Sequence, residues 1–361
     1  MQKRHIRMIS AAAAMAIPLG AAVIGGVAVP SAQAQANTVS ASRITAPARP
    51  PVVGVNLYVN ENYSLADTKA WGERDLAYIR NTLGLYAVAI DWDYNVPSQD
   101  ASVVEDSPTR TPTISDIRAL TDIAKSLGLR VEYRVLFAID NKDNRDDSIA
   151  PKNFPVWLGS LLATEAPALR LAARERVPEF VVGSEMASID QSPLWRGFFK
   201  RAARIYRGSL SYAAWGGHTT TQGFFGGSRL VLPTYELGAT AYPRVNLGAN
   251  ASVASLTKAW ELYLTAHTPA SVLRRTAIDE IGIPALAGSY ADPWLWDNVK
   301  GTADPTVQAR WFQAACAAVT AEHMRGIYFW SESLNDDPAQ PFDSLVGFLG
   351  RPESLAAIES C

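Results

Sequence analysis

Short apolar runs alternate with longer amphipathic ones along most of the chain. Runs rich in β-branched and aromatic residues, bounded by Gly, Pro, Asp or Asn, predict strands, and they span residues 52–59, 85–93, 129–137, 179–185, 209–215, 237–243, 275–284 and 326–333. Apolar residues at spacings of three and four predict helices between them, most clearly over residues 68–84, 113–128, 194–207, 252–267 and 306–324.

A strand followed by a helix, repeated eight times, is typical of a (β/α)8 TIM barrel in a single domain. We expect Gly84 and Gly128 to end the first two helices in the left-handed conformation, and Thr113 or Ser115 to cap the second helix. The helical signal is weakest in the fifth unit, where residues 216–236 are Gly-rich. An open doubly wound sheet is the alternative, but no G-x-G-x-x-G follows the first strand.

The N-terminal region has a different composition. Basic residues precede an Ala-, Gly- and Val-rich run that ends in an A-x-A site at Ala34, and this order predicts a signal peptide over residues 1–34. Cleavage after Ala36 and a retained anchor are the alternatives. Residues 35–51 read as a flexible linker before a catalytic domain over residues 52–361. We therefore expect a secreted, extracellular protein with no membrane anchor.

The net charge of the chain bears on which kinds of partner it could bind. The chain has 33 Lys and Arg and 35 Asp and Glu; removing the signal peptide takes three basic residues and leaves 30 minus 35, or −5. This balance gives no reason to expect a nucleic-acid or anionic-membrane partner, and we expect a monomer.

In an oxidising compartment Cys316 and Cys361 would form a disulfide that closes a loop of about 46 residues. Two free thiols are the alternative.

Two glutamates stand at predicted strand ends. Glu185 ends the fourth strand and Glu280 lies near the end of the seventh, and the C-terminal ends of barrel strands meet at one mouth. Two carboxyl groups there suit glycoside hydrolysis, in which one protonates the leaving oxygen and the other attacks the sugar or activates a water. A solvated side chain is the alternative for each. Strand alternation predicts that Asp279 points away from Glu280.

Three stretches resemble a known group of enzymes. "VVGSEMAS", "IDEIGIPA" and "YFWSES" resemble the retaining glycoside hydrolases of the 4/7 superfamily (clan A), most of all glycoside hydrolase family 113 and other TIM-barrel-like glycoside hydrolases. The resemblance implies that Glu185 is the acid/base, Glu280 is the nucleophile, Tyr242 hydrogen-bonds the nucleophile and Trp330 floors the subsite of the cleaved sugar. Many members carry Asn, in contact with the sugar 2-hydroxyl, where this chain has Ser184.

Other residues at the same mouth are candidates for substrate binding. Asp91 and Asp93 end the second predicted strand and could bind sugar hydroxyls, or be ordinary surface carboxylates. Trp294 and Trp296 follow the seventh strand; sugar rings stack on exposed aromatic faces, although packing beneath a loop is an equal alternative.

Other polar residues are predicted to have structural roles, and Glu332 is a secondary candidate for the site. Glu132 and Arg134 share a face of the third strand, which predicts pairing inside the barrel. Glu332 could face the mouth or cap the following loop. The histidines show no metal-ligand spacing, so we expect neither a metal nor a cofactor, and no G-x-S-x-G elbow is present.

These patterns together predict a secreted glycoside hydrolase that cleaves β-glycosidic bonds of a polysaccharide or oligosaccharide by retaining double displacement. The family resemblance implies an endo-β-1,4-mannanase. The alternatives are a non-catalytic glycan-binding barrel and a cell-wall-modifying transglycosylase.

Overall fold

The computed structural model describes residues 50–140, 146–219, 222–225, 237–295, 301–340 and 345–361, which belong to one compact unit. The predicted signal peptide and nearly all of the predicted linker lie outside the described residues. Within the described part of the chain, no helix combines the length and apolar character needed to cross a membrane.

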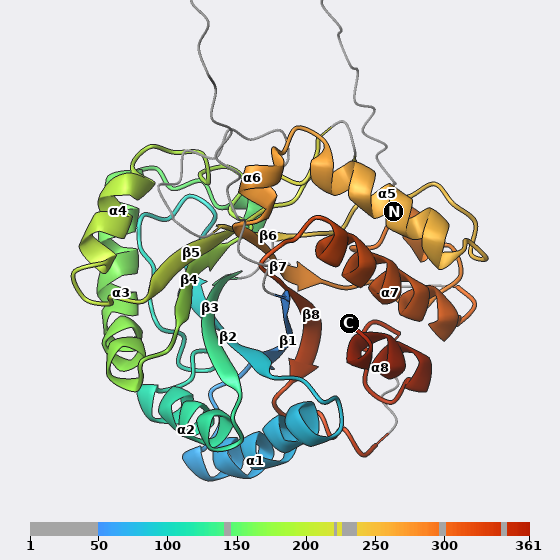
Figure 1. The fold of residues 1–361 in the computed structure, drawn as a ribbon. Helices are drawn as coiled ribbons and strands as arrows, with labels where there is room; N and C mark the ends of the chain where they lie inside the picture. The colour runs from blue at the N-terminus through green and yellow to red at the C-terminus, as the bar shows by residue number, and fades with distance from the viewer. Residues whose placement is uncertain (1–49, 141–145, 220–221, 226–236, 296–300, 341–344) are drawn as a thin grey trace, which may run out of the picture. The chain divides into compact units, whose positions relative to one another are not determined.

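Parallel strands close into a barrel in which each strand pairs with its neighbours in chain order and β8 pairs with β1 (Figure 1). The strands are β1 Val52–Val59, β2 Ala87–Val96, β3 Arg130–Ile139, β4 Glu179–Ser184, β5 Ser209–Ala214, β6 Leu237–Thr240, β7 Thr276–Ile281 and β8 Gly326–Ser333. All eight strands predicted from the sequence are confirmed, and so is the (β/α)8 fold.

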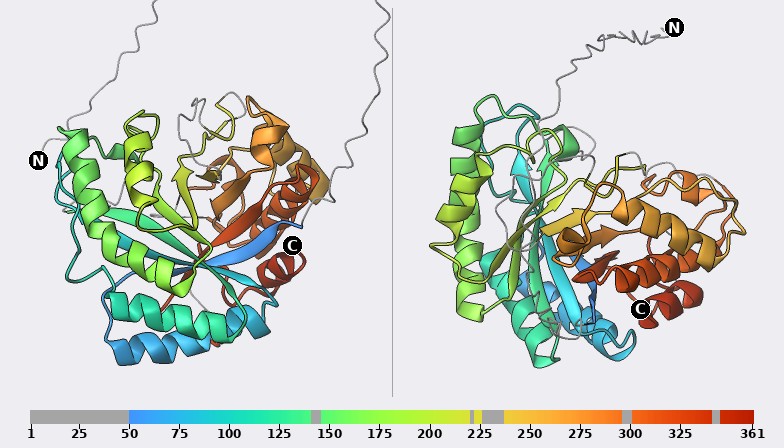
Figure 2. Two further views of the ribbon diagram at one scale, coloured as in Figure 1. Left: turned by 60° about the vertical axis from the view of Figure 1, so that its left-hand side comes forward. Right: turned by 45° about the horizontal axis from the view of Figure 1, so that its top comes forward.

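The helices surround the strands on the outside, as Figures 1 and 2 show. They are α1 Leu65–Asn81, α2 Ile114–Ser126, α3 Phe154–Glu175, α4 Trp195–Ala202, α5 Val253–Thr265, α6 Ala270–Leu273, α7 Pro305–Ala321 and α8 Pro352–Glu359, with short 3-10 turns η1 Asp146–Ser148 and η2 Ser289–Ala291. The apolar periodicity did not predict α3, which carries Pro167 in its interior, where proline usually breaks a helix.

The ends of the first two helices follow the predicted local chemistry. The Thr113 side chain caps α2 in a reciprocal capping box with Asp116, a pairing that satisfies two otherwise orphaned backbone N–H groups. Gly84 and Gly128 adopt φ angles of 65° and 76°, in the left-handed region that glycine enters without steric cost. Helix α1 begins earlier than the periodicity indicates, because Ser64 caps it.

A bulge in β7 changes which side chains face the barrel interior. Ala239 of β6 pairs with Ile278, but the next residue, Thr240, pairs with Glu280, so one residue of β7 is skipped and the alternation of faces is interrupted. Asp279 is fully buried, and a Cβ added at Gly238, two residues before the cavity-lining Thr240, would meet its carboxyl group. The expectation that Asp279 and Glu280 point to opposite faces was therefore wrong, and both project into the barrel.

A disulfide joins Cys316 of α7 to Cys361, which follows α8, with a Cα–Cα distance of 5.4 Å. This confirms the pairing preferred from the sequence. The bond fastens the last helix to the outer ring of the barrel.

Candidate active site

A cavity of about 420 Å³ opens at the C-terminal ends of the strands, where a TIM barrel carries its functional groups. Its acidic lining residues come from different parts of the barrel: Asp93 from β2, Asp147 from η1, Glu185 from the end of β4 and Glu280 from β7. The remaining lining is largely aromatic and comprises Tyr58, Phe137, Trp215, His218, Tyr242, Trp294 and Trp330, together with Leu136, Gly216 and Thr240.

The backbone turns sharply at Glu185. A side chain at Gly183 would place its Cβ 2.7 Å from Cε of Met186, so glycine allows the chain to fold back after β4. Glu185 itself has a φ angle of 57°, a left-handed conformation that costs a non-glycine residue roughly 1–2 kcal/mol. Its backbone N–H donates to the carbonyl of Ala213 on β5 at 2.9 Å, which fixes the turn and directs the carboxyl group into the cavity.

The carboxyl group of Glu185 is partly exposed to the cavity and hydrogen-bonded by the Thr240 side chain. Burial, and secondly the negative charge of Glu280, raise the pKa of Glu185 to about 7. Both causes disfavour the ionised form. Glu185 therefore holds a proton at weakly acidic pH and can give it up near neutrality.

Glu280 lies in a different electrostatic environment. The guanidinium of Arg134 pairs with its Oε2 atom, and the hydroxyl of Tyr242 donates to Oε1 at 2.5 Å. Burial, followed by the charge of Glu280, raises the pKa of Tyr242 well above its ordinary value, so the phenol keeps its proton and acts as the donor. A cation and a hydroxyl thus hold the two oxygens of one buried carboxylate.

Arg134 connects several of these groups. It is fully buried, donates to the backbone carbonyl of Asp279 at 2.7 Å, and lies 3.6 Å from the carboxylate of Asp91. Its guanidinium is 5.4 Å from the centre of the Trp330 ring. The sequence indicated that Glu132 and Arg134 pair with each other or with neighbouring charges inside the barrel, and favoured a structural role. It did not identify Glu280 as the partner of Arg134.

The two aspartates predicted at the end of β2 have different surroundings. Asp91 is fully buried beneath the cavity, beside Arg134, and does not line it. Asp93 lines the cavity and accepts a hydrogen bond from the Tyr58 hydroxyl at 2.6 Å. The Tyr58 ring in turn lies 5.3 Å from the Trp330 ring. Tyr58, Asp93 and Trp330 therefore form one wall of the cavity, built from β1, β2 and β8.

The opposite wall contains Trp215, His218 and Trp294. The ring of His218 stacks on Trp294 with centroids 3.9 Å apart and meets the ring of Trp215 edge-on at 4.7 Å. The guanidinium of Arg244 lies 4.6 Å from the Trp294 ring centre. Trp296, the second tryptophan predicted in this region, lies outside the described residues.

Ser184 is not brought into the cavity. It is fully buried at the end of β4, and its hydroxyl has no hydrogen-bond partner among the described residues. Ser184, next to the acid/base candidate, is therefore buried below the cavity surface and does not line the cavity.

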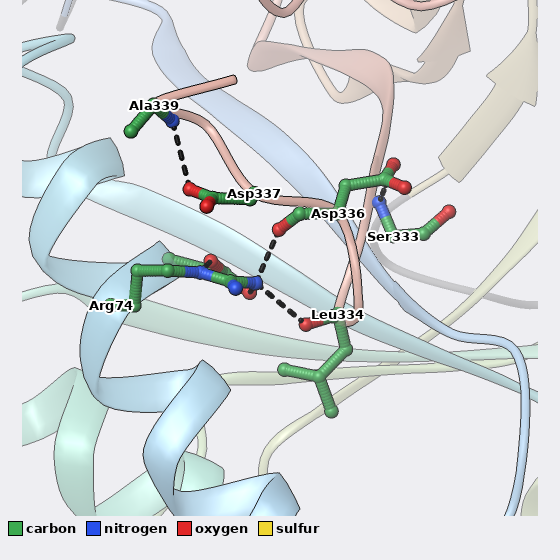
Figure 3. A network of polar contacts seen from close by, with 7 residues as sticks. Arg74, Ser333, Leu334, Asp336, Asp337 and Ala339 are labelled. Carbon is green, nitrogen blue, oxygen red and sulfur yellow. Dashed lines mark hydrogen bonds and ion pairs between the residues drawn. The ribbon is translucent and has the colours of Figure 1, made fainter. Parts of the chain in front are cut away.

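Glu332 faces helix α1 rather than the cavity lining. It is fully buried, and its charge interacts with those of Asp75, Asp336 and Arg74. Figure 3 shows the adjoining network, in which Arg74 donates to the backbone carbonyls of Leu334 (3.2 Å) and Asp336 and so ties the segment after β8 to α1. Glu332 therefore lies beside this network, and neither of its carboxyl oxygens has a hydrogen-bond partner among the described residues.

Position at a strand end pointed to Asp93, Glu185 and Glu280, and the family resemblance pointed to Tyr242 and Trp330. Tyr58, Thr240 and Trp215 also stand at or just beyond strand ends, and the same rule applied to every polar or aromatic residue there would have found them. His218 and Asp147 lie in connecting segments and carried no such signal. Within the described part of the chain, no group of three or more His, Cys, Asp and Glu side chains could hold a metal ion.

Comparisons with known proteins agree with this fold. The model of Glycoside Hydrolase Family 113 matches residues 68–341. A family 113 β-1,4-mannanase solved as a complex superposes with a TM-score of 0.70 and 16% identity, covering 86% of this chain and 98% of that one. No curated protein sequence matches the chain.

Two further structures are similar. The family 113 β-mannanase AaManA from Alicyclobacillus acidocaldarius, in complex with ManMIm, gives a TM-score of 0.67 and 18% identity over 86% of this chain and 97% of that one. The GH5_18 protein from Streptomyces cattleya, in complex with GlcNAc, gives 0.54 and 14% over 87% and 80% of the two chains. At these identities the superpositions establish the shared barrel fold.

Proposed function

The chain belongs to glycoside hydrolase family 113 and is a glycoside hydrolase, and we propose that it cleaves β-1,4-linked mannan or manno-oligosaccharides with retention of configuration. The observation that carries this proposal is the contrast between two carboxyl groups in one cavity. Glu185 is held in conditions that favour its protonated form, whereas Glu280 is paired with a cation. A carboxyl group that keeps its proton beside one that is paired with a cation suits the roles of acid and nucleophile.

Glu280 is the nucleophile in this scheme. Arg134 and Tyr242 hold its two oxygens, so the carboxylate is oriented before the substrate arrives and needs little reorganisation during attack. It attacks the anomeric carbon, the glycosidic C–O bond breaks, and a covalent glycosyl-enzyme forms.

Glu185 is the general acid and then the general base. It gives its proton to the departing glycosidic oxygen, and afterwards it removes a proton from the water that attacks the glycosyl-enzyme. Esterification of Glu280 cancels the negative charge that helps to raise the pKa of Glu185. The pKa of Glu185 then falls, as the change of role from acid to base requires.

The substrate class rests on the relatives and on the lining of the cavity. Two family 113 structures with TM-scores of 0.70 and 0.67 are β-mannanases. The cavity here has aromatic walls and acidic groups, with no lysine or arginine among its described lining residues, a composition suited to neutral sugars rather than anionic ones.

The same proposal includes secretion. Residues 1–34 have the sequence of a signal peptide, and a disulfide between Cys316 and Cys361 suits an oxidising compartment. Mass spectrometry of the protein from culture medium would test both points, since a chain that begins at Gln35 or Asn37 is expected there.

Activity is tested with the chain lacking residues 1–34 and with its Glu185→Gln and Glu280→Gln variants. Reducing-sugar release is measured on mannan, glucan, galactan, xylan and arabinan, and the anomer first formed is read by proton NMR. The expected result is cleavage of mannan to a β-configured product, lost in both variants without a lower melting temperature. Binding of a glycan without turnover, equal in all three proteins, would refute the hydrolase assignment. An α-configured first product would refute retention.

A further inference from the structure

His218 occupies a defined position in the wall made by Trp215 and Trp294. It follows β5, lines the cavity, and its backbone N–H donates to Oε1 of Gln222 at 2.9 Å. Its carbonyl accepts from the backbone N–H of Arg244 at 2.7 Å. These contacts fix the main chain at His218, so its ring has a restricted range of orientations.

Trp294 supports the imidazole ring and lines the cavity beside it. His218 covers one face at a centroid distance of 3.9 Å, and the guanidinium of Arg244 lies over the ring at 4.6 Å. Arg244 is held in turn by Asp292 at 2.6 Å. This stack therefore holds the imidazole of His218 in the cavity lining.

The hydrogen bond on one ring nitrogen determines the character of the other. Nδ1 of His218 lies 3.2 Å from the carbonyl oxygen of Tyr242. A carbonyl can only accept, so Nδ1 carries the proton. Burial lowers the pKa of His218 below its ordinary value, against an opposing effect of the Tyr242 carbonyl, and the ring is neutral near pH 7. Nε2 consequently has a free lone pair and is a hydrogen-bond acceptor.

Nε2 has no hydrogen-bond partner among the described residues. The atom is also not completely buried. It is therefore accessible from the cavity that His218 lines. An accessible acceptor whose tautomer is fixed by the protein is suited to a hydroxyl donor, and sugars present hydroxyl donors.

The position of His218 relative to Glu185 indicates which sugar it meets. Strands β4 and β5 are neighbours, and the backbone N–H of Glu185 bonds to Ala213 of β5, the strand after which His218 follows. Trp330 and Tyr58 lie on the far side of the barrel, on β8 and β1. The acid must stand beside the oxygen of the departing sugar, so the wall next to Glu185 is the leaving-group side.

We propose that Nε2 of His218 accepts a hydrogen bond from a hydroxyl of the leaving-group sugar and thereby favours oligosaccharide substrates with a correctly oriented sugar beyond the scissile bond. This inference rests on the proposed function and specifies one part of that site. His218 is a substrate-binding residue in this account, and Arg244 and Trp294 are positioning residues that act through it.

The test compares two substrates with the same mannobiosyl group. One carries further β-1,4-linked mannose as the leaving group, and the other carries 2,4-dinitrophenolate, which has no sugar hydroxyl. The measured quantity is the ratio of kcat/KM for the oligosaccharide to that for the aryl glycoside. In His218→Phe, which keeps a stacked ring and loses Nε2, this ratio is expected to fall about tenfold, the usual effect of one hydrogen bond. An unchanged ratio overturns the proposal.

His218→Gln is the matched variant, because its amide oxygen can reach the position of Nε2. Its ratio is expected to stay closer to wild type than that of His218→Phe, and equal losses in both would overturn the acceptor role. If the Phe variant does not fold, His218→Asn replaces it, since its shorter amide reaches only the Nδ1 position. Failure of the proposed function is separate: the wild-type protein would then cleave neither substrate.

Discussion

Arg134 of β3 reaches across the inside of the barrel to pair with Glu280 of β7, the strand opposite. The two residues are 146 positions apart, and closure of the barrel is what brings them together. Arg134 also lies 3.6 Å from Asp91, so one buried cation serves two buried carboxylates. This arrangement makes Arg134 important for both stability and catalysis, and the two contributions can be separated by experiment.

Replacing Arg134 with Met is expected to lower kcat by at least about 100-fold, because Glu280 loses the group that orients it. The free energy of unfolding should fall by about 3–5 kcal/mol, since the substitution leaves buried carboxylates without their cation. Urea unfolding and steady-state kinetics at pH 6 would measure the two effects.

The double variant Arg134→Met, Asp91→Asn is the control. Removing the charge of Asp91 should recover part of the lost stability, whereas kcat should remain as low as in the single variant. Recovery of activity together with stability would show that Arg134 acts through folding alone and would contradict a direct role at Glu280.

The pKa of Glu185 should depend on the charge of Glu280. In Glu280→Gln we expect the pKa of Glu185 to fall from about 7, because the neighbouring negative charge is the second cause of its elevation. It should remain above the ordinary glutamate value, because burial is the first cause and is unchanged. Carbon-13 NMR titration of the labelled side-chain carboxyl groups measures this shift.

The same pKa governs activity in wild type. Glu185 must be protonated to act as an acid, so kcat/KM should be retained below pH 7 and lost as the pH rises through about 7. In Glu185→Ala, added azide should restore turnover of an aryl glycoside and remove this alkaline decline. A decline that persists in the azide-rescued variant would assign the pKa to another group.

The strands and most of the cavity were predictable for one physical reason. A strand buried on both faces needs a short apolar run with polar or glycine boundaries, and the topology of a barrel brings every strand end to one mouth. Glu185 and Glu280 were placed around a common space because each stands at the end of such a run, and the family resemblance added Trp330. All three line the cavity.

The remainder depended on contacts that local patterns do not encode. The bulge that turns both Asp279 and Glu280 inward follows from the register of β6 against β7, and no spacing in the sequence indicates it. Helix α3 was not among the helices whose bounds the periodicity gave, and it continues through Pro167, a residue that normally ends a helix. His218 lies in a connection, where neither periodicity nor strand ends apply.

Loss of the disulfide should affect stability without affecting chemistry. Cys316 and Cys361 lie on the outer ring, apart from the cavity lining. Replacing both with Ala opens a loop of about 46 residues, which the chain-entropy relation associates with roughly 4 kcal/mol. Denaturant unfolding of the double variant should show this loss, while kcat/KM at 25 °C stays within about twofold of wild type. If reducing the disulfide of the wild-type protein lowers the free energy of unfolding by the same amount, the effect of the double variant comes from the bond itself.

Glu165 carries a cost to stability that should vary with pH. It lies on α3, is fully buried, and neither carboxyl oxygen has a hydrogen-bond partner among the described residues. Burial raises its pKa well above the ordinary glutamate value. In the unfolded chain the group ionises near that ordinary value, while in the folded protein it keeps its proton. The unfolded state therefore gains an advantage as the pH rises, by up to about 1.4 kcal/mol per pH unit.

Glu165→Met, which keeps the side-chain volume and removes the ionisable group, should consequently be more stable than wild type. The difference should grow over the interval from the ordinary glutamate pKa of 4.5 towards neutral pH. Urea unfolding at three pH values in this interval measures the difference. The matched control is Glu73→Met at an exposed position of α1, where burial imposes no such cost and the difference should not grow. A stability gain at Glu165 that is constant across the interval would mean that the carboxyl group ionises in the folded protein and would contradict this prediction.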